Sequence, residues 1–219
     1  MGRENKKESV AALHREQILK AADQQFSQKG YEQTTIADLS EASGYSRRTI
    51  YAYFESKEEM LYHLIEKGLQ ALKADIEDAV SLQGDFVTRY KAICQAMRRY
   101  QKNHPHSVAH VNNANAASLE DGELSEMVKR ILLLGTEINR VLTAFLQAGK
   151  ESGMVRRDVV PALSVFVLWS GITSLLTLAE TKGAFLCNQF SISEDQLLDY
   201  GFQQLINSIL EVRISDGLQ

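Results

Sequence analysis

The sequence contains few residues that interrupt helices. Only two of its 219 residues are proline. Proline removes a backbone hydrogen bond and clashes with the preceding helical turn, so its scarcity permits long uninterrupted helices. Runs of alternating β-branched residues, which are typical of strands, are also rare. The sequence therefore predicts an all-α fold, which the apolar periodicity divides into about nine helices.

Cysteine is equally rare, and its placement excludes two kinds of site. Cys94 and Cys187 are far apart in the sequence and match neither a metal-binding nor a redox spacing. We expect both to be buried thiols in a reducing compartment. The amino terminus is polar and lacks the apolar segment of a signal peptide, so we expect a cytoplasmic protein. No pattern predicts a cofactor.

A large excess of positive charge is also absent. The chain has 24 Lys and Arg residues against 28 Asp and Glu residues, which gives a net charge of −4. This balance excludes a protein that coats nucleic acid without sequence preference, whereas a site-specific binder needs only a local basic patch. Even residues 1–60 hold nine basic and ten acidic side chains. The basic residues that do gather are Arg3, Lys6, Lys7, Arg47, Arg48 and Lys57.

One long apolar segment is present. Val159–Ala179 contains no charged residue and is long enough to span a membrane. However, it contains Pro161 and five Ser or Thr residues. A helix that packs on protein along two faces has the same composition. We therefore interpret the segment as a doubly buried helix and expect no membrane contact.

The stretch from Thr35 to Lys57 has the pattern of two short helices joined by a tight turn. Thr35 is placed to cap the first helix with its hydroxyl. Gly44 can adopt the left-handed conformation that ends a helix. Ser46 follows directly and is placed to cap the second helix.

The second helix, Arg47–Tyr53, has one inward and one outward face. Ile50 and Phe54 are four residues apart and would both face inward. Ser56 would then cap the next helix, with Glu59 completing a capping box. This pattern predicts either a helix-turn-helix or an ordinary helical hairpin with a solvated face. The residues expected to face mostly outward are Arg47, Arg48, Thr49, Tyr51 and Tyr53.

The motifs in this stretch favour the helix-turn-helix. Thr-Thr-Ile-x-x-Leu, Gly-Tyr-Ser, Thr-Ile-Tyr-x-Tyr-Phe and Ser-Lys-Glu resemble the DNA-binding domain of the tetracycline-repressor (TetR) family of bacterial regulators. The resemblance runs from about Arg15 to about Leu64. Beyond it, the chain is similar to the family only in helical layout and length. We expect a flexible tail over residues 1–12, a three-helix DNA-binding domain over 13–58 and a larger helical effector-binding and dimerisation domain over 59–219.

The resemblance assigns DNA contacts to the two short helices. The first turn of the second helix would enter the major groove. There Arg48, in preference to Arg47, is expected to read guanine, and Thr49 to contact a thymine methyl. Phosphate contacts are expected from the hydroxyls or backbone N–H groups of the capping residues and from nearby side chains. The residues assigned to phosphate are Thr35, Ser46, Tyr51, Tyr53 and Lys57.

The resemblance also implies a ligand cavity lined by the helix predicted from Asp85 to about Asn103. A stripe of aromatic and sulfur-containing residues at this spacing is equally typical of a plain core. His106 and His110 have the spacing of a metal-binding pair, but no third ligand is nearby, so we predict no metal site. The predicted lining residues are Tyr90, Cys94, Met97, His110, Asn113, Trp169 and Thr173.

The last predicted helix, Ser193 to about Val212, is apolar over more than half of its surface. Such a helix must bury a second face, and no later segment is left in the sequence to cover it. A self-complementary two-fold interface is the simplest cover. The resemblance likewise implies a dimer made by the last two helices. The predicted interface residues are Phe166, Leu198, Phe202, Leu205 and Ile209.

Together these features predict a ligand-responsive, sequence-specific transcriptional regulator. The resemblance implies a homodimeric repressor that a small-molecule effector releases from a palindromic operator. Two alternatives remain open: an all-helical enzyme, and a DNA-binding adaptor without a small-molecule ligand. No Ser-His-Asp arrangement, phosphate loop or metal spacing in the sequence supports the enzyme.

Overall fold

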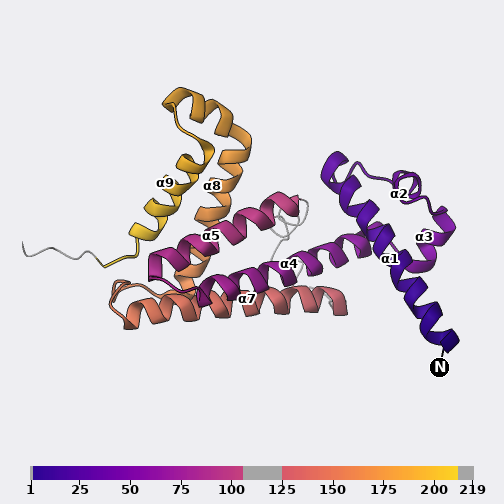
Figure 1. Cartoon of the computed structure of the whole chain (residues 1–219), viewed down its shortest axis with the longest axis horizontal. Coiled ribbons are helices and arrows are strands. Elements are labelled where there is room, and N and C mark those ends of the chain that lie inside the picture. Colours follow the sequence, from indigo (N-terminus) through magenta and orange to yellow (C-terminus); the bar gives the residue numbers. More distant parts are fainter. Residues whose placement is uncertain (1, 106–124, 212–219) are drawn as a thin grey trace, which may run out of the picture. The chain divides into compact units, whose positions relative to one another are not determined.

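The computed structural model describes residues 2–105 and 125–211, and these residues form eight α-helices (Figure 1). The all-α prediction is confirmed. Residues 1, 106–124 and 212–219 lie outside the described part of the chain. The helices are α1 (Gly2–Lys29), α2 (Ile36–Ser43), α3 (Arg47–Tyr53), α4 (Lys57–Ser81), α5 (Phe86–Asn103), α7 (Glu126–Glu151), α8 (Pro161–Phe190) and α9 (Glu194–Asn207).

The first helix is longer than its sequence pattern predicts. α1 begins at Gly2, so the residues expected to form a flexible tail are helical instead. The segment contains no proline and includes Ala11 and Ala12, which are strong helix formers. α8 continues past Gly183, which is buried within the helix, and ends at Ser191 in a left-handed conformation.

The chain divides into two compact units. Unit 1 contains residues 1–70 and 102–134, and unit 2 contains residues 71–101 and 135–219. Unit 1 is thus larger than the predicted DNA-binding domain, because it includes the first half of α4 and part of α7. α4 and α7 each supply residues to both units.

The core of unit 1 holds the two short helices against the two long ones. α1 contributes Ile18 and Phe26, which are at most 2% exposed. α2 contributes only Leu39 and α3 only Ile50 as fully buried residues. Helices this short are unstable alone, so tertiary packing must supply their stability. Figure 1 shows α2 and α3 beside α1.

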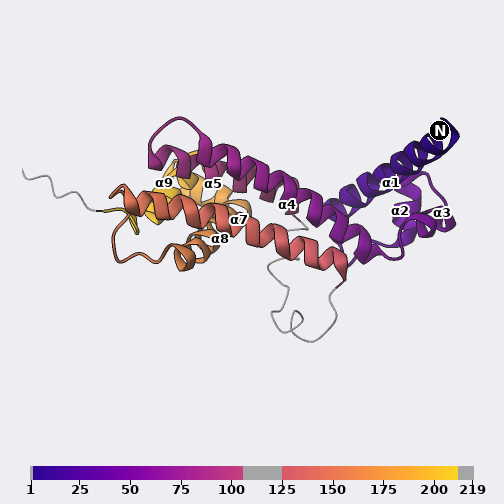
Figure 2. The same cartoon turned by 90° about the horizontal axis from the view of Figure 1, so that it is seen from below.

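Unit 2 is built from two kinds of helix contact. The α5 and α7 helices meet where the rings of Phe86 and Phe145 stack with centroids 4.5 Å apart. On another side of α7, Lys73 of α4 lies 3.6 Å from Glu137 (Figure 2). α8 and α9 form an antiparallel hairpin in which Gly171 allows close approach of Leu205.

The α8 helix packs against α5 and α7 on one side and against α9 on another, and it leaves a third side exposed. Its buried residues Val165, Leu168, Ile172, Leu176 and Ala179 follow helical spacing. Within the single chain, α8 therefore packs along two sides but still exposes several apolar residues. By length and composition alone, α7 and α8 could each cross a membrane. A packed core helix passes the same test, so the absence of membrane contact stays a prediction.

The Gly171 contact can be tested by a matched pair of substitutions. A Cβ added at Gly171 would lie 2.7 Å from Leu205 Cδ2, whereas one at Gly135 of α7 meets nothing within 4 Å. Gly171→Val should lower the free energy of unfolding by about 1–3 kcal/mol, as overpacked cores do. Gly135→Val should be nearly neutral. Equal values from urea unfolding of both variants would contradict close packing of α8 on α9.

Candidate nucleic-acid interface and pocket

The α2 helix starts and ends at the residues predicted to delimit it. The Thr35 hydroxyl accepts a hydrogen bond from the Asp38 N–H at 3.2 Å, and Gly44 ends the helix with φ of 72°. The Asp38 carboxylate accepts the Thr35 N–H in return, at 2.7 Å. Hydrogen bonds from Lys29 and Thr35 hold the pKa of Asp38 well below its usual range. Sequence reasoning missed this capping box, although an acidic residue three positions after the cap was its signal.

The α3 helix begins at the predicted cap. The Thr49 N–H donates to Ser46 Oγ at 3.1 Å, and the two hydroxyls lie 2.9 Å apart. Ile50 is fully buried and Phe54 is 1% exposed, so the inward face is as predicted. That packing fixes the rotation of α3 about its own axis.

Four residues of α3 are exposed to solvent, namely Arg47, Arg48, Tyr51 and Ala52. Arg47 and Arg48 are exposed, and neither forms a hydrogen bond or ion pair within the part of the chain that the structure describes. Tyr51 is 55% exposed. The first turn of α3 therefore presents two cations whose donors are available to an external acceptor.

Tyr53 does not face outward. Its hydroxyl is 3.0 Å from His14 Nδ1, and its carbonyl accepts a hydrogen bond from Arg15 at 2.6 Å. The prediction that Tyr53 lies on the outer face is wrong, because these contacts join the end of α3 to α1. A phosphate contact from this half-buried residue stays a prediction.

Lys57 is a structural contact at the start of α4. Its ammonium donates to the Tyr31 carbonyl at 2.6 Å and to the Thr34 carbonyl at 3.0 Å. It also lies 4.2 Å from the centre of the Tyr31 ring. Two of its three donors are thus used to hold α4 against the loop between α1 and α2. Only one donor remains for the predicted phosphate contact.

Glu59 forms only half of the predicted capping box. Its N–H donates to Ser56 Oγ at 3.0 Å, as expected. Its carboxylate, however, accepts from the Glu55 N–H instead of the Ser56 N–H, at 2.6 Å. At the start of α4, the Glu59 carboxylate therefore bonds to the N–H of the residue before Ser56, and not to the N–H of Ser56 itself.

Arg15 is a positioning residue that sequence reasoning did not identify. Its guanidinium donates to the Tyr53 carbonyl of α3 and to Nε2 of His63 on α4, at 2.6 and 2.9 Å. It also lies 4.5 Å from the centre of the Phe54 ring. One side chain of α1 therefore fixes the end of α3 and the first turns of α4. Local sequence pattern gives no signal for such a contact between distant residues.

The Arg15 contact requires a neutral His63. Arginine can only donate, so Nε2 of His63 must accept and carry no proton. Burial and the charge of Arg15 lower the pKa of His63 below its ordinary value, although Glu59 and Glu66 act in the opposite direction. Glu66 is also paired with Arg130 of α7 at 2.7 Å.

A lowered His63 pKa makes stability depend on pH. The unfolded chain takes up a proton near pH 6.5, while the folded chain resists it. The contribution of His63 is therefore complete above about pH 6.5 and decreases as the pH falls below that value. Replacing His63 by Gln should flatten the pH dependence of the free energy of unfolding between pH 8 and pH 5, measured with urea. Parallel profiles for the two proteins would contradict a neutral, Arg15-bound His63.

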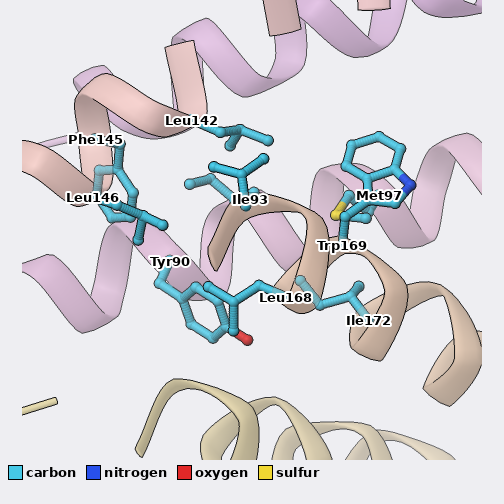
Figure 3. Close-up of a pocket in the computed structure, with 10 residues that line it drawn as sticks. Tyr90, Ile93, Met97, Leu142, Phe145, Leu146, Leu168, Trp169 and Ile172 are labelled. Carbon is cyan, nitrogen blue, oxygen red and sulfur yellow. The ribbon is translucent and has the colours of Figure 1, made fainter. Parts of the chain in front are cut away.

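A small cavity lies between α5, α7 and α8 in unit 2, with a volume of about 30 Å³ (Figure 3). Three of the predicted lining residues, Tyr90, Met97 and Trp169, lie on its wall. Sequence reasoning missed the contribution of α7. The complete lining is Tyr90, Ile93 and Met97 of α5, Leu142, Phe145 and Leu146 of α7, and Val165, Leu168, Trp169 and Ile172 of α8.

The other predicted lining residues lie elsewhere. Cys94 is fully buried on α5 but is not among the lining residues. The Thr173 hydroxyl donates to the carbonyl of Trp169 in its own helix at 2.9 Å and does not line the cavity. His110 and Asn113 fall outside the described residues, as does the possible metal ligand His106.

Three of the four interface residues predicted near the carboxyl end are buried within the single chain. Leu198 and Phe202 are 1% exposed and Ile209 is also buried, all within the single chain. Leu205 packs against Gly171 of α8. The apolar side of α9 packs on α8, which leaves little of these residues exposed to a partner, and an interface role of the half-buried Leu205 stays a prediction. Phe166, the fifth, is 59% exposed.

The exposed apolar surface belongs to α8 instead. Leu163 is 65% exposed and Val167 is 68% exposed, and one turn separates them. Leu178 and Phe185 continue the same side of the helix at helical spacing. We call these four residues with Phe166 the α8 face. The outer side of α9 is polar, apart from Tyr200.

Comparison with known proteins identifies the two-helix motif. Residues 18–64 match the family model of bacterial regulatory proteins of the tetR family. The HTH-type transcriptional regulator YfiR of Bacillus subtilis is 51% identical over 53 residues, which is 24% of this chain and 26% of YfiR. The HTH-type transcriptional repressor KstR2 of Rhodococcus jostii is 24% identical over 156 residues, 66% of this chain and 69% of KstR2.

The similarity extends to the fold of the whole chain. The TetR family regulator PfmR from Thermus thermophilus is 27% identical, and the match covers 89% of this chain and 98% of PfmR with a TM-score of 0.65. The family model accounts for the helices that carry Arg47 and Arg48, and the PfmR structure for the helical domain that follows. The chain belongs to the TetR family of helix-turn-helix transcriptional regulators, which are not enzymes.

Proposed function

We propose that this regulator is a repressor that binds a palindromic operator as a homodimer and leaves it when a small molecule occupies unit 2. The observation that supports DNA reading most directly is the exposed, unpaired state of Arg47 and Arg48 among the described residues. Repression is proposed because the similar KstR2 is named a repressor. A cytoplasmic location follows from this role.

The first turn of α3 is proposed to read bases in the major groove. Arg48 would donate to O6 and N7 of a guanine, a contact that discriminates between bases by about 1–3 kcal/mol. Arg47 and Tyr51 would contact phosphates on either side of the groove. Thr49 is half-buried with its hydroxyl beside Ser46, so its methyl group is the part proposed to contact a thymine.

The test is a selection of genomic fragments with the full-length protein. The wild type should retain fragments that share an inverted repeat with half-sites about 34–36 Å apart. Arg48→Ala should relax base preference at one position in each half-site, whereas Arg47→Ala should weaken binding to all fragments evenly. Arg157→Ala, which removes an exposed charge outside α3, is the matched control. An unchanged motif with Arg48→Ala refutes base reading by Arg48, and no enriched fragment with the wild type refutes the function.

A second copy of this chain is proposed to cover the α8 face. An apolar surface of this length on one helix is typical of an interface, and a palindromic operator requires a two-fold dimer. The centre of the face carries Ser170 and Ser174, small residues that allow two helices to approach closely. Because α9 is polar on its outer side, the contact is proposed to be made mainly between two α8 helices.

Charges on the α8 face should separate the dimer. Leu163→Glu combined with Val167→Glu would place four carboxylates in the two-fold interface, and we expect monomers in sedimentation velocity. The same protein should bind the operator more weakly, because the DNA-binding domain of a monomer contacts only one half-site. Gln204→Glu combined with Asn207→Glu on the outer side of α9 is the control and should remain dimeric. Dimers of the α8 variant would place the interface elsewhere.

The effector is proposed to act by shifting a conformational equilibrium. The α4 and α7 helices each supply residues to both units. We propose that a movement of α7 around the pocket is passed along these helices to unit 1, which contains α2 and α3. Effector and operator must then weaken each other's binding by the same factor, commonly about 1–3 kcal/mol of coupling. A DNA-binding adaptor without a ligand is the alternative, and it would show no such reciprocity.

A further inference from the structure

The unit 2 cavity has an unusually uniform chemistry. All ten lining residues have apolar or aromatic side chains, and none is Asp, Glu, Lys, Arg or His. The helix that contributes four of them, α8, has no charged residue before Glu180. An ion that entered this space would lose its hydration without gaining a partner, which costs many kcal/mol.

Only two of the lining side chains carry a polar oxygen or nitrogen atom. These atoms are Tyr90 Oη and Trp169 Nε1 (Figure 3). The surface that lines the cavity is wholly apolar. The Thr173 hydroxyl, one turn beyond Trp169, is bonded to carbonyls of its own helix at 2.9 and 3.1 Å. Tyr90 Oη is buried without a hydrogen-bond partner among the described residues, so it is the polar atom of this wall available to a small uncharged polar group, and no wall residue can neutralise a charge.

The cavity is smaller than a ligand, so its occupant must move part of the wall. A cavity of about 30 Å³ has room for no more than one or two water molecules. Met97 is the most flexible lining residue, because its unbranched thioether side chain can change rotamer at little cost. The Trp169 ring is only half-buried and forms the part of the wall nearest to solvent.

We propose that the effector site takes an uncharged hydrocarbon group, such as a single aromatic ring or a short branched alkyl group, and excludes carboxylates of the same shape. Entry displaces the Met97 side chain. This inference rests on the proposed function, since it names the ligand class of the proposed effector site. Any charged part of a larger effector must remain outside the wall formed by α5, α7 and α8.

Toluene and benzoate are suitable probes, because they have similar shapes but differ in charge. The melting temperature of the wild-type protein should rise with toluene concentration and should not respond to benzoate at the same concentrations and ionic strength. Met97→Ala enlarges the cavity, so it should increase the shift caused by toluene. Met127→Ala, at a methionine that does not line the cavity, is the matched control and should leave the shift unchanged.

Each outcome decides one point. A shift with benzoate equal to that with toluene overturns the ligand class, as does a toluene shift that is independent of Met97. No toluene shift in either the wild type or Met97→Ala also overturns it. Operator affinity is measured separately by fluorescence anisotropy with and without toluene. If toluene binds through Met97 but operator affinity is unchanged, the effector role in the proposed function fails while the ligand class stands.

Discussion

The burial of one face of α3 is the constraint on which the DNA-reading surface depends. A helix of seven residues cannot hold its own conformation in water, so its orientation must come from its neighbours. Ile50 and Phe54 insert into the core of unit 1, and Arg15 fixes the carbonyl of Tyr53. Because the inner face is held in this way, Arg47 and Arg48 must point into solvent.

Several polar residues that look like DNA contacts serve this orientation first. Lys57 and Tyr53 direct their polar groups at α1 or at the loop after it, and the N–H and hydroxyl of Thr35 are bonded to Asp38. Such residues position the reader, and any phosphate contact they make uses what remains of their hydrogen-bonding capacity. Arg47 and Arg48, at the start of α3, are two exposed cations that form no hydrogen bond or ion pair within the described residues, and they give α3 a local positive patch in a domain that is not basic.

In unit 2, three sides of α8 carry apolar residues, and each side has a different role. One stripe of α8 lines the cavity with α5 and α7, a second receives α9, and the third remains exposed as the α8 face. A helix without charged residues over two-thirds of its length can meet all three demands, and this explains why the same segment resembles a membrane span by composition. The proposed dimer, the proposed effector site and the hairpin thus share one helix.

The sequence by itself determined the helical class, the limits of α2 and α3, and the inward residues of α3, because caps, glycine and helical periodicity are local signals. It also determined that apolar surface near the carboxyl end exceeds what one partner needs. Only the tertiary structure decided that α9 covers α8 within the chain, that α7 completes the cavity, and that Arg15 bonds to His63. These contacts join residues that are far apart in the sequence. They form only where particular faces of two helices meet, and the periodicity of one helix shows which face is apolar but not which helix will cover it.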